Sequence, residues 1–312
     1  MPWLIGIDEA GYGPNLGPFV QMAVAWQVPQ GDGDLWTRLN DWITKAPHKR
    51  GDRRILIDDS KIVHQGVQGV ARLARGVLST FGAGPTLADF VSPLLSEIDA
   101  AALQLEPWYD PRESVPIANY RQLRADLSAA LIESECIIGP VCARLIQPTL
   151  FNAIIDEHHS KGAVLSRGLI DLLQWMDAKL PEYEPLFVEA DKQGGRQSYE
   201  GLIAEAFPTS WVRCLHEAHD LSHYRVEGRW RTVEVRFRPR ADAANTAVAL
   251  ASMGCKYLRE ICMGQFNRYW QRHIPGIRRT AGYPVDALRF WREILPMVEQ
   301  LGLDHATLWR KR

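Results

Sequence analysis

Residues 3–17 read WLIGIDEAGYGPNLG, an apolar run that ends in the charged pair Asp8 and Glu9 and passes directly into a glycine-rich segment. An apolar run of this length that stops at charges and glycines predicts a buried strand followed by a tight turn. A second apolar stretch at 19–28 is closed by proline and glycine. The two stretches together predict a hairpin.

A strand of the same kind lies far along the chain. Residues 186–191 read LFVEAD and again end in an aspartate, Asp191, shortly before two glycines. Because neighbouring strand ends in an α/β sheet meet at one edge, we expect Asp8 and Asp191 to lie close together. Clustered carboxylates repel one another unless a cation binds, and ligand sets made of oxygen alone favour Mg²⁺ or Mn²⁺ over zinc.

The rest of the chain alternates strand and helix patterns, which predicts an α/β fold with a mixed central sheet flanked by helices. Further strands are expected at 55–57, 137–146, 211–215 and 229–238, and helices at 60–78, 123–133, 243–274 and 284–300. One or two helices, interrupted near Gly162, are expected at 150–180. The proline- and glycine-rich stretch 81–116 has no lasting period. We expect one main domain at 1–274 with an insertion around 82–130, and a C-terminal helical extension at 275–312.

Composition restricts the class of protein only loosely. The 312 residues are 46% hydrophobic, which can supply a sizeable core, and their formal net charge is -1. A polyanionic partner would therefore be held by a local basic surface rather than by a global field. The five cysteines lack the close paired spacings of a zinc site. They predict reduced core thiols in a cytoplasmic protein. With no leader-like start and no bilayer-length apolar segment, no membrane association is expected.

Two other kinds of binding site fit the residues less well. The glycines at 11, 13 and 17 give the spacing G-x-G-x-x-x-G, which misses the dinucleotide fingerprint by one residue. The adjacent Asp8 and Glu9 would also oppose a pyrophosphate. His216, His219 and His223 stand at spacings of three and four, but the strand pattern around them predicts surface or core histidines rather than metal ligands.

The segment from Gly6 to Pro18, GIDEAGYGPNLGP, closely resembles the opening motif of the type 2 ribonuclease H family. Further similarities follow in the same order along the chain. They are the Asp-Asp-Ser-Lys stretch at 58–61, the strand at 188–191, the Arg-Ala-Asp stretch at 240–242 with its alanine-rich helix, and Gly282-Tyr283. The resemblance covers both ends of the chain but not residues 82–130.

This resemblance implies a ribonuclease H-like fold and a metal-dependent endonuclease that cleaves the RNA strand of an RNA–DNA hybrid or a ribonucleotide embedded in DNA. By the family pattern, the catalytic and metal-binding residues are Asp8, Glu9, Asp191 and Asp242. The pattern implies two Mg²⁺ or Mn²⁺ ions. It also implies substrate contacts from the following residues: Gly11, Tyr12, Gly13, Lys61 and Tyr283. In this picture the glycine turn presents backbone amides to the 2′-hydroxyl. From its position before a helical stretch, Asp242 is also expected to be the N-cap of that helix, which is compatible with a role as metal ligand or proton handler.

The chain departs from the family pattern at two places. Tyr12 stands where the family usually has arginine, and Thr280-Ala281 stands where it usually has a His-Lys pair. These departures leave two alternatives open. One is a nuclease of the same fold with an altered nucleic-acid substrate, and the other is a non-catalytic protein that binds nucleic acid or a protein partner.

Overall fold

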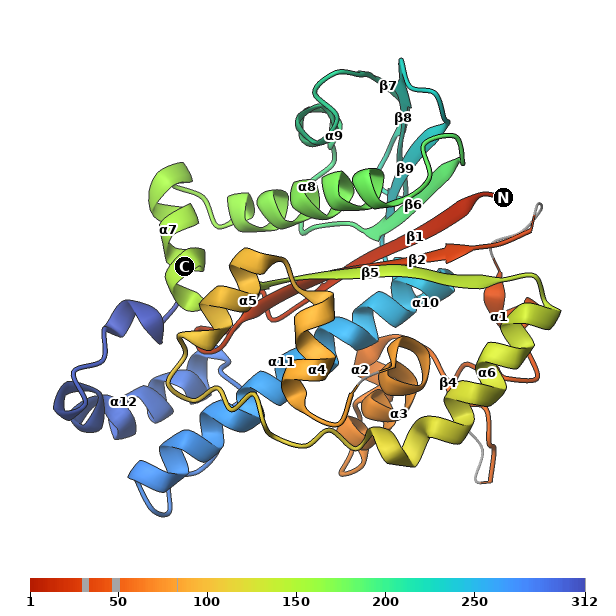
Figure 1. The fold of residues 1–312 in the computed structure, drawn as a ribbon. Coiled ribbons are helices and arrows are strands. Elements are labelled where there is room, and N and C mark those ends of the chain that lie inside the picture. The colour runs from red at the N-terminus through yellow and green to blue at the C-terminus, as the bar shows by residue number, and fades with distance from the viewer. Residues whose placement is uncertain (30–33, 47–50, 83, 312) are drawn as a thin grey trace.

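The computed structural model describes residues 1–29, 34–46, 51–82 and 84–311 (Figure 1). Its centre is a seven-stranded sheet in the order β5-β2-β1-β6-β9-β8-β7. The strands are β1 (Trp3–Ala10), β2 (Phe19–Gln27), β5 (Ile137–Ile146), β6 (Leu186–Asp191), β7 (Trp211–Glu217), β8 (Ser222–Glu227) and β9 (Val233–Arg238). β1, β6 and β9 are parallel, and every other neighbouring pair is antiparallel. The expected mixed α/β architecture is confirmed.

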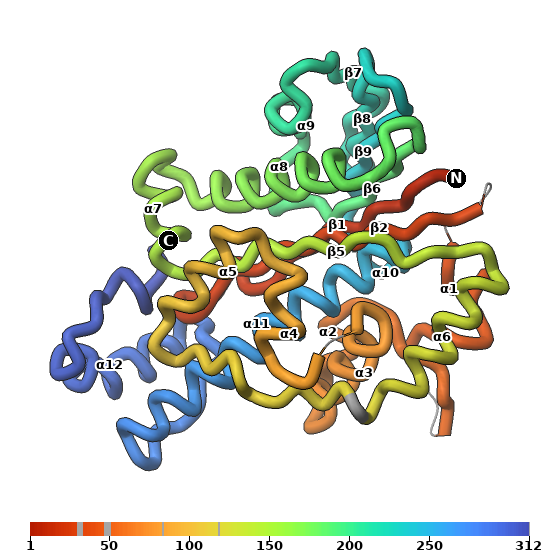
Figure 2. Tube along the Cα trace, viewed as in Figure 1, coloured from red at the N-terminus to blue at the C-terminus, as the bar shows by residue number. Residues whose placement is uncertain are grey.

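Helices cover both faces of this sheet (Figures 1 and 2). The long helix α11 (Thr246–His273) crosses one face of β1 and β2, and α8 (Gly162–Lys179) lies on the other face. Packed on the α11 side are α2 (Ser60–Val63), α3 (Gly69–Phe81), α4 (Leu87–Val91), α5 (Glu97–Gln104) and α6 (Arg121–Glu133). The other α-helices and strands in the described part of the chain are α1 (Leu35–Arg38), β3 (Ile43–Thr44), β4 (Ile55–Leu56), α7 (Pro148–His158), α9 (Glu200–Ala206), α10 (Ala241–Ala244) and α12 (Pro284–Gln300).

The alternation of side chains along β1 and β2 divides the core in two. Met22 and Trp26 point into a cluster with α3 and α11, whereas Ile5 and Ile7 point into a cluster with α8 and α9. Successive strand residues face opposite sides, so a strand buried on both faces is apolar throughout, as β2 is. A smaller cluster joins α12 to Leu16, just after the glycine turn.

Local breaks explain most differences from the expected elements. The helix expected at 60–78 is two helices, because Gly66 adopts a positive φ of 71° between α2 and α3. The loop-rich stretch 81–116 contains α4 and α5. The strand expected at 229–238 begins only at Val233, and β8 and α9 were not expected at all.

The five cysteines are all free, and four of them are at least partly buried. Cys214 on β7 is exposed, so the expectation that every thiol lies in the core is wrong for this residue. Among the helices that the structure describes, none combines the length and apolar character needed to cross a membrane.

Gly6 allows α11 to lie directly against β1, which generates a first prediction. A Cβ at this position would lie 2.1 Å from the carbonyl carbon of Ala247 and 2.2 Å from the amide nitrogen of Val248. Neither backbone atom can move without displacing the helix, so Gly6→Ala should lower the free energy of unfolding by about 3 kcal/mol or more. Gly201→Ala is the matched control, because nothing lies within 4 Å of a Cβ there. Chemical denaturation should show the control unchanged or slightly stabilised, and equal stability of the two variants would contradict this packing.

Candidate active site

Two parallel strands bring the first two predicted carboxylates to one edge of the sheet. Ile7 on β1 pairs with Ala190 on β6, so Asp8 and Asp191 are the next residues on adjacent strands. Asp8 and Asp242 are buried, with 7% and 6% of their surfaces exposed, whereas Asp191 and Glu9 are partly buried. Asp242 arrives from α10, which begins shortly after β9 ends. Three segments distant in sequence thus converge on this edge.

Burial raises the pKa of all four carboxyl groups, and the charges of neighbouring carboxylates raise it further for Asp8, Glu9 and Asp242. Burial, and then the charges of Asp242 and Asp191, raise the pKa of Asp8 to about 7. Burial, and then the charges of Asp59 and Asp191, raise the pKa of Asp242 to about 6. Burial, followed by the charges of Asp8 and Asp191, raises the pKa of Glu9 well above its usual value. Burial likewise raises the pKa of Asp191. The four groups therefore form one electrostatic cluster, which we call the carboxylate cluster.

The carboxylate cluster has the chemistry of a site for hard cations, although its side chains are not arranged as a finished coordination shell. In the described ranges, no group of three or more His, Cys, Asp or Glu residues is placed to hold a metal ion. The four groups supply only oxygen donors, which suit Mg²⁺ or Mn²⁺. A divalent cation would also remove the repulsion that raises their pKa values. The residues present therefore fit the metal that the sequence predicts.

Hydrogen bonds fix the strand and helix ends around the cluster. A backbone amide of α10, that of Ala241, donates to Asp191 Oδ1 at 3.3 Å, and the Ser252 hydroxyl of α11 bonds to Asp8. Asp242 is not a helix cap: α11 is capped by Asn245, which accepts from the amides of the first helical turn. The expected capping role is therefore wrong, and the Asp242 carboxylate is available to the cluster.

Lys61 lies close to the carboxylate cluster, as its predicted substrate role requires. The positive charge of Lys61 partly offsets the rise in the pKa values of Glu9, Asp191 and Asp242 that burial causes. It stands at the start of α2, where Asp59 accepts a hydrogen bond from the Lys61 amide at 2.8 Å. The Lys61 ammonium is exposed, so this cation can meet a phosphate next to the carboxylates.

The glycine turn is held from beneath by two buried arginines. The guanidinium of Arg259 on α11 donates to Pro18 O at 2.5 Å, to Leu16 O at 3.1 Å and to Ala281 O at 2.9 Å. Arg310, whose exposed fraction is 0%, donates to Gly11 O at 2.7 Å and to Pro14 O. We call this pair the arginine clamp. It draws carbonyl oxygens of the turn inward, which fixes the orientation of the peptide groups between them.

The arginine clamp lies so close to the backbone of the turn that it determines where a residue must lack a side chain. Gly11 has a φ of 84°, and a Cβ there would lie 2.7 Å from Cδ of Arg259. Gly13 is exposed and has no positive φ, and a Cβ there would meet only Tyr283 Cε1 at 3.9 Å. A side chain at position 13 would therefore leave the turn unchanged, whereas Gly11 and Gly17, with φ of 84° and 78° and close neighbours at the Cβ position, exclude other residues.

The two predicted aromatic contacts differ in their neighbours and in their exposure. Tyr12 packs edge-on against Phe19, with their ring centroids 5.9 Å apart, and the Lys161 ammonium lies 4.6 Å from the centroid of the Tyr12 ring. Tyr283 is 52% exposed and lies beside Gly13. Tyr283 is thus open to a ligand, whereas Tyr12 is half-buried and places the charge of Lys161 near the turn.

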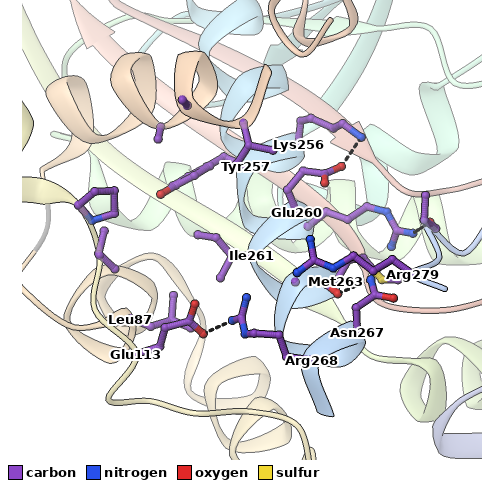
Figure 3. A pocket seen from close by; sticks show the side chains of 18 of the residues that line it. Leu87, Glu113, Lys256, Tyr257, Glu260, Ile261, Met263, Asn267, Arg268 and Arg279 are labelled. Carbon is purple, nitrogen blue, oxygen red and sulfur yellow. Dashed lines mark hydrogen bonds and ion pairs between the residues drawn. The ribbon is translucent and has the colours of Figure 1, made fainter. Parts of the chain in front are cut away.

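A cavity of about 890 Å³ lies beside Tyr283, between α3, α11 and the segment 278–283. Figure 3 shows its charged side chains facing one another. Lys256 pairs with Glu260 at 2.6 Å, and Arg268 pairs with Glu113. None of the four carboxylates lines it. Size alone would make this cavity the candidate site, but the convergence of buried like charges favours the strand ends.

Several residues that shape the site were not anticipated from the sequence. They are Asp59, Ser252, Arg259 and Arg310. Asp59 and Ser252 lie within or next to segments that resemble the family pattern, which was a usable signal. Arg310 lies 299 residues from its partner Gly11, and no local pattern indicates a contact of that range.

Comparisons with known proteins give distant structural similarities only. No protein-family model matches the chain, and no curated protein matches it. It is similar to a chain of the PCNA:RNase HII complex from Archaeoglobus fulgidus, with 15% identity over 99% of this chain and 94% of that chain at a TM-score of 0.43. It is similar to ribonuclease H2 from Pyrococcus horikoshii OT3, with 17% identity over 98% of this chain and 92% of that chain at 0.45. For Bst-RNase HIII in complex with Mn²⁺ the identity is 14% over 99% of this chain and 66% of that chain, at 0.41. At these TM-scores the likenesses add nothing to the site.

The raised pKa values predict how stability depends on pH in the absence of metal. The pKa of Asp8 is about 7 in the folded protein against an ordinary 3.8, so the folded state keeps a proton that the unfolded state releases. Below pH 4 both states are protonated, and as pH rises from 4 through 7 the folded state loses stability. In EDTA, Asp8→Asn should therefore raise the free energy of unfolding at pH 8 by roughly 1–3 kcal/mol and have less effect at pH 5. Thermal unfolding across this pH range measures it, and a pH-independent difference would count against the cluster.

The arginine clamp predicts that the C-terminal segment controls the order of the turn. Arg310→Met would leave the carbonyls of Gly11 and Pro14 without their donor, costing roughly 2 kcal/mol of stability. Hydrogen–deuterium exchange of the peptide spanning 11–18 should accelerate. Lys311→Met is the matched control, because Lys311 is exposed and its ammonium pairs with Asp156 at 2.5 Å, away from the turn. Equal exchange of this peptide in both variants would exclude the clamp.

Proposed function

We propose that this protein is a metal-dependent nuclease of the ribonuclease H type, with the carboxylate cluster as its active site. The observation that carries the proposal is the placement of Asp8 and Asp191 at adjacent parallel strand ends, in electrostatic contact with Glu9 and Asp242. Such a cluster is costly unless cations bind it. The presence of this costly cluster in a well-packed fold therefore favours a cation-binding, catalytic protein over a non-catalytic one.

Asp8, Asp191 and Glu9 would hold two Mg²⁺ or Mn²⁺ ions, and Asp242 would be the fourth ligand or would handle a proton. When bound, such ions supply an activated water and stabilise the leaving 3′-oxygen of an in-line displacement at phosphorus. Asp242 suits the fourth position, because it reaches the cluster from α10 and its carboxylate does not serve as a helix cap.

The proposed substrate is an RNA–DNA hybrid or a duplex with an embedded ribonucleotide. Lys61 would contact a phosphate beside the cluster, and the exposed Tyr283 would pack against the nucleic acid. In our proposal the amides of the turn from Gly11 to Gly13 face the 2′-hydroxyl, because the arginine clamp takes the carbonyl oxygens to the opposite side. Lys161 would supply the positive charge that the family arginine supplies at position 12.

A cleavage assay tests this function. Purified protein with Mn²⁺ should cut a hybrid and a duplex with a single ribonucleotide but leave a DNA duplex intact. Asp191→Asn removes a ligand rather than a supporting contact, so it should reduce cleavage by more than roughly 100-fold. Glu133→Gln, which removes an exposed carboxylate at the end of α6, should cut at the wild-type rate. Equal cutting of DNA would establish the altered-substrate alternative, and no cutting of any duplex would establish the non-catalytic one.

A further inference from the structure

The sheet face that carries Asp8 and Asp191 continues outward over β9, β8 and β7 as a charged surface. Arg238 on β9 is the cross-strand partner of Asp191, and Arg236 is the partner of Glu189. On the outer strands, Arg225 pairs with Glu234 and with Arg213. These four arginines, Arg213, Arg225, Arg236 and Arg238, form what we call the arginine strip.

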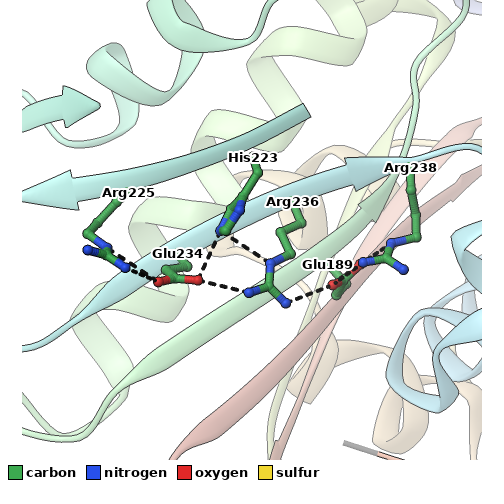
Figure 4. Close-up of polar contacts among 6 residues, drawn as sticks. All are labelled: Glu189, His223, Arg225, Glu234, Arg236 and Arg238. Carbon is green, nitrogen blue, oxygen red and sulfur yellow. Dashed lines mark hydrogen bonds and ion pairs between the residues drawn. The ribbon is translucent and has the colours of Figure 1, made fainter. Parts of the chain in front are cut away.

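Two glutamates beneath the strip hold the guanidinium groups of Arg225, Arg236 and Arg238 in place (Figure 4). Glu234 pairs with Arg225 at 2.8 Å and with Arg236 at 3.0 Å, and Glu189 pairs with Arg238 at 3.0 Å. The side chains of Glu234 and Glu189 are 9% and 13% exposed, whereas those of Arg225 and Arg238 are 44% and 38% exposed. Glu234 and Glu189 thus lie beneath Arg225 and Arg238, and along β8 and β9 the guanidinium groups are more exposed than the carboxylates that hold them.

At the outer end of the strip, two positively charged side chains lie opposite each other on neighbouring strands. Arg213 and Arg225 are direct cross-strand partners, and like charges in that position destabilise a sheet. Arg213 is 66% exposed and forms an ion pair at 3.5 Å with Glu227, whose side chain is itself 44% exposed. Both guanidinium groups have donors to spare, because each carries five N–H groups. An anion bound between the two would relieve the repulsion.

We infer that the arginine strip binds phosphates of the nucleic-acid backbone beyond the scissile position. This inference rests on the proposed function, because it extends the footprint of that same site. Strands lie about 4.8 Å apart and rise about 3.3 Å per residue, so the strip begins one strand from Asp191 and ends within roughly 20 Å of it. That span matches a few nucleotides of a duplex that lies across the carboxylate cluster. The ion pairs fix the arginines in advance, which lowers the entropy lost on binding.

The salt dependence of binding tests the strip. A fluorescein-labelled RNA–DNA hybrid is titrated with wild-type protein and with R213Q/R225Q, in EDTA so that no strand is cut. Each phosphate contact adds about 0.9 to the slope of log K against log salt, so the double variant should lose roughly 1–2 from that slope. Its affinity should fall by about 10-fold. R167Q/K179Q is the matched control, because it removes two exposed charges from α8 on the opposite face of the sheet.

A charge-preserving variant separates charge from folding. R213K/R225K should keep most of the wild-type slope, because phosphate contacts by lysine release counterions as well. The inference is overturned if R213Q/R225Q keeps the wild-type slope of log K against log salt, or if R167Q/K179Q loses as much of that slope. Failure of wild-type protein to bind the hybrid also overturns it. If the slope falls as expected but wild-type protein cuts no duplex with Mn²⁺, the strip stands and the nuclease activity fails.

Discussion

Repulsion between carboxylates at one sheet edge is the constraint on which this structure depends. Asp191 at the end of β6 lies beside Asp8 near the end of the parallel strand β1, and Asp242 and Glu9 add their charges to the same volume. Burial alone would penalise each charge, and proximity raises the penalty further. A fold keeps such an arrangement only if the rest of the chain stabilises it. The buried clusters on both faces of the sheet supply that stabilisation.

The surroundings of the cluster are positioned by buried cations that have backbone partners. Arg259 and Arg310 donate hydrogen bonds to carbonyl oxygens of the glycine turn, and Arg259 also donates to the carbonyl oxygen of Ala281. Bonds to a charged donor are stronger than neutral ones. The turn is therefore defined by residues from α11 and from the C-terminal segment. In this way the two ends of the chain build one site.

The sequence alone predicts the parts of the site that local residue patterns encode. Asp8 and Asp191 could be paired in advance, because an apolar strand that stops at an aspartate is a short-range signal. The break at Gly66 and the strand β8 were missed, although Tyr224 and Val226 alternate with exposed residues as a half-buried strand should. Arg310 could not have been found, because its contact with Gly11 depends on how α12 returns to the sheet. The opposed pair Arg213 and Arg225 likewise depends on a strand register that a sequence does not display.

The most direct test of the account is a crystal structure of the protein with Mn²⁺, with the ion located by its anomalous scattering. The account predicts a peak between Asp8 and Asp191, with carboxylate oxygens at about 2.1 Å, and the Glu9 or Asp242 side chain turned towards it. A saturated crystal whose only manganese peaks lie away from these strand ends would contradict the claim that the carboxylate cluster is a metal site.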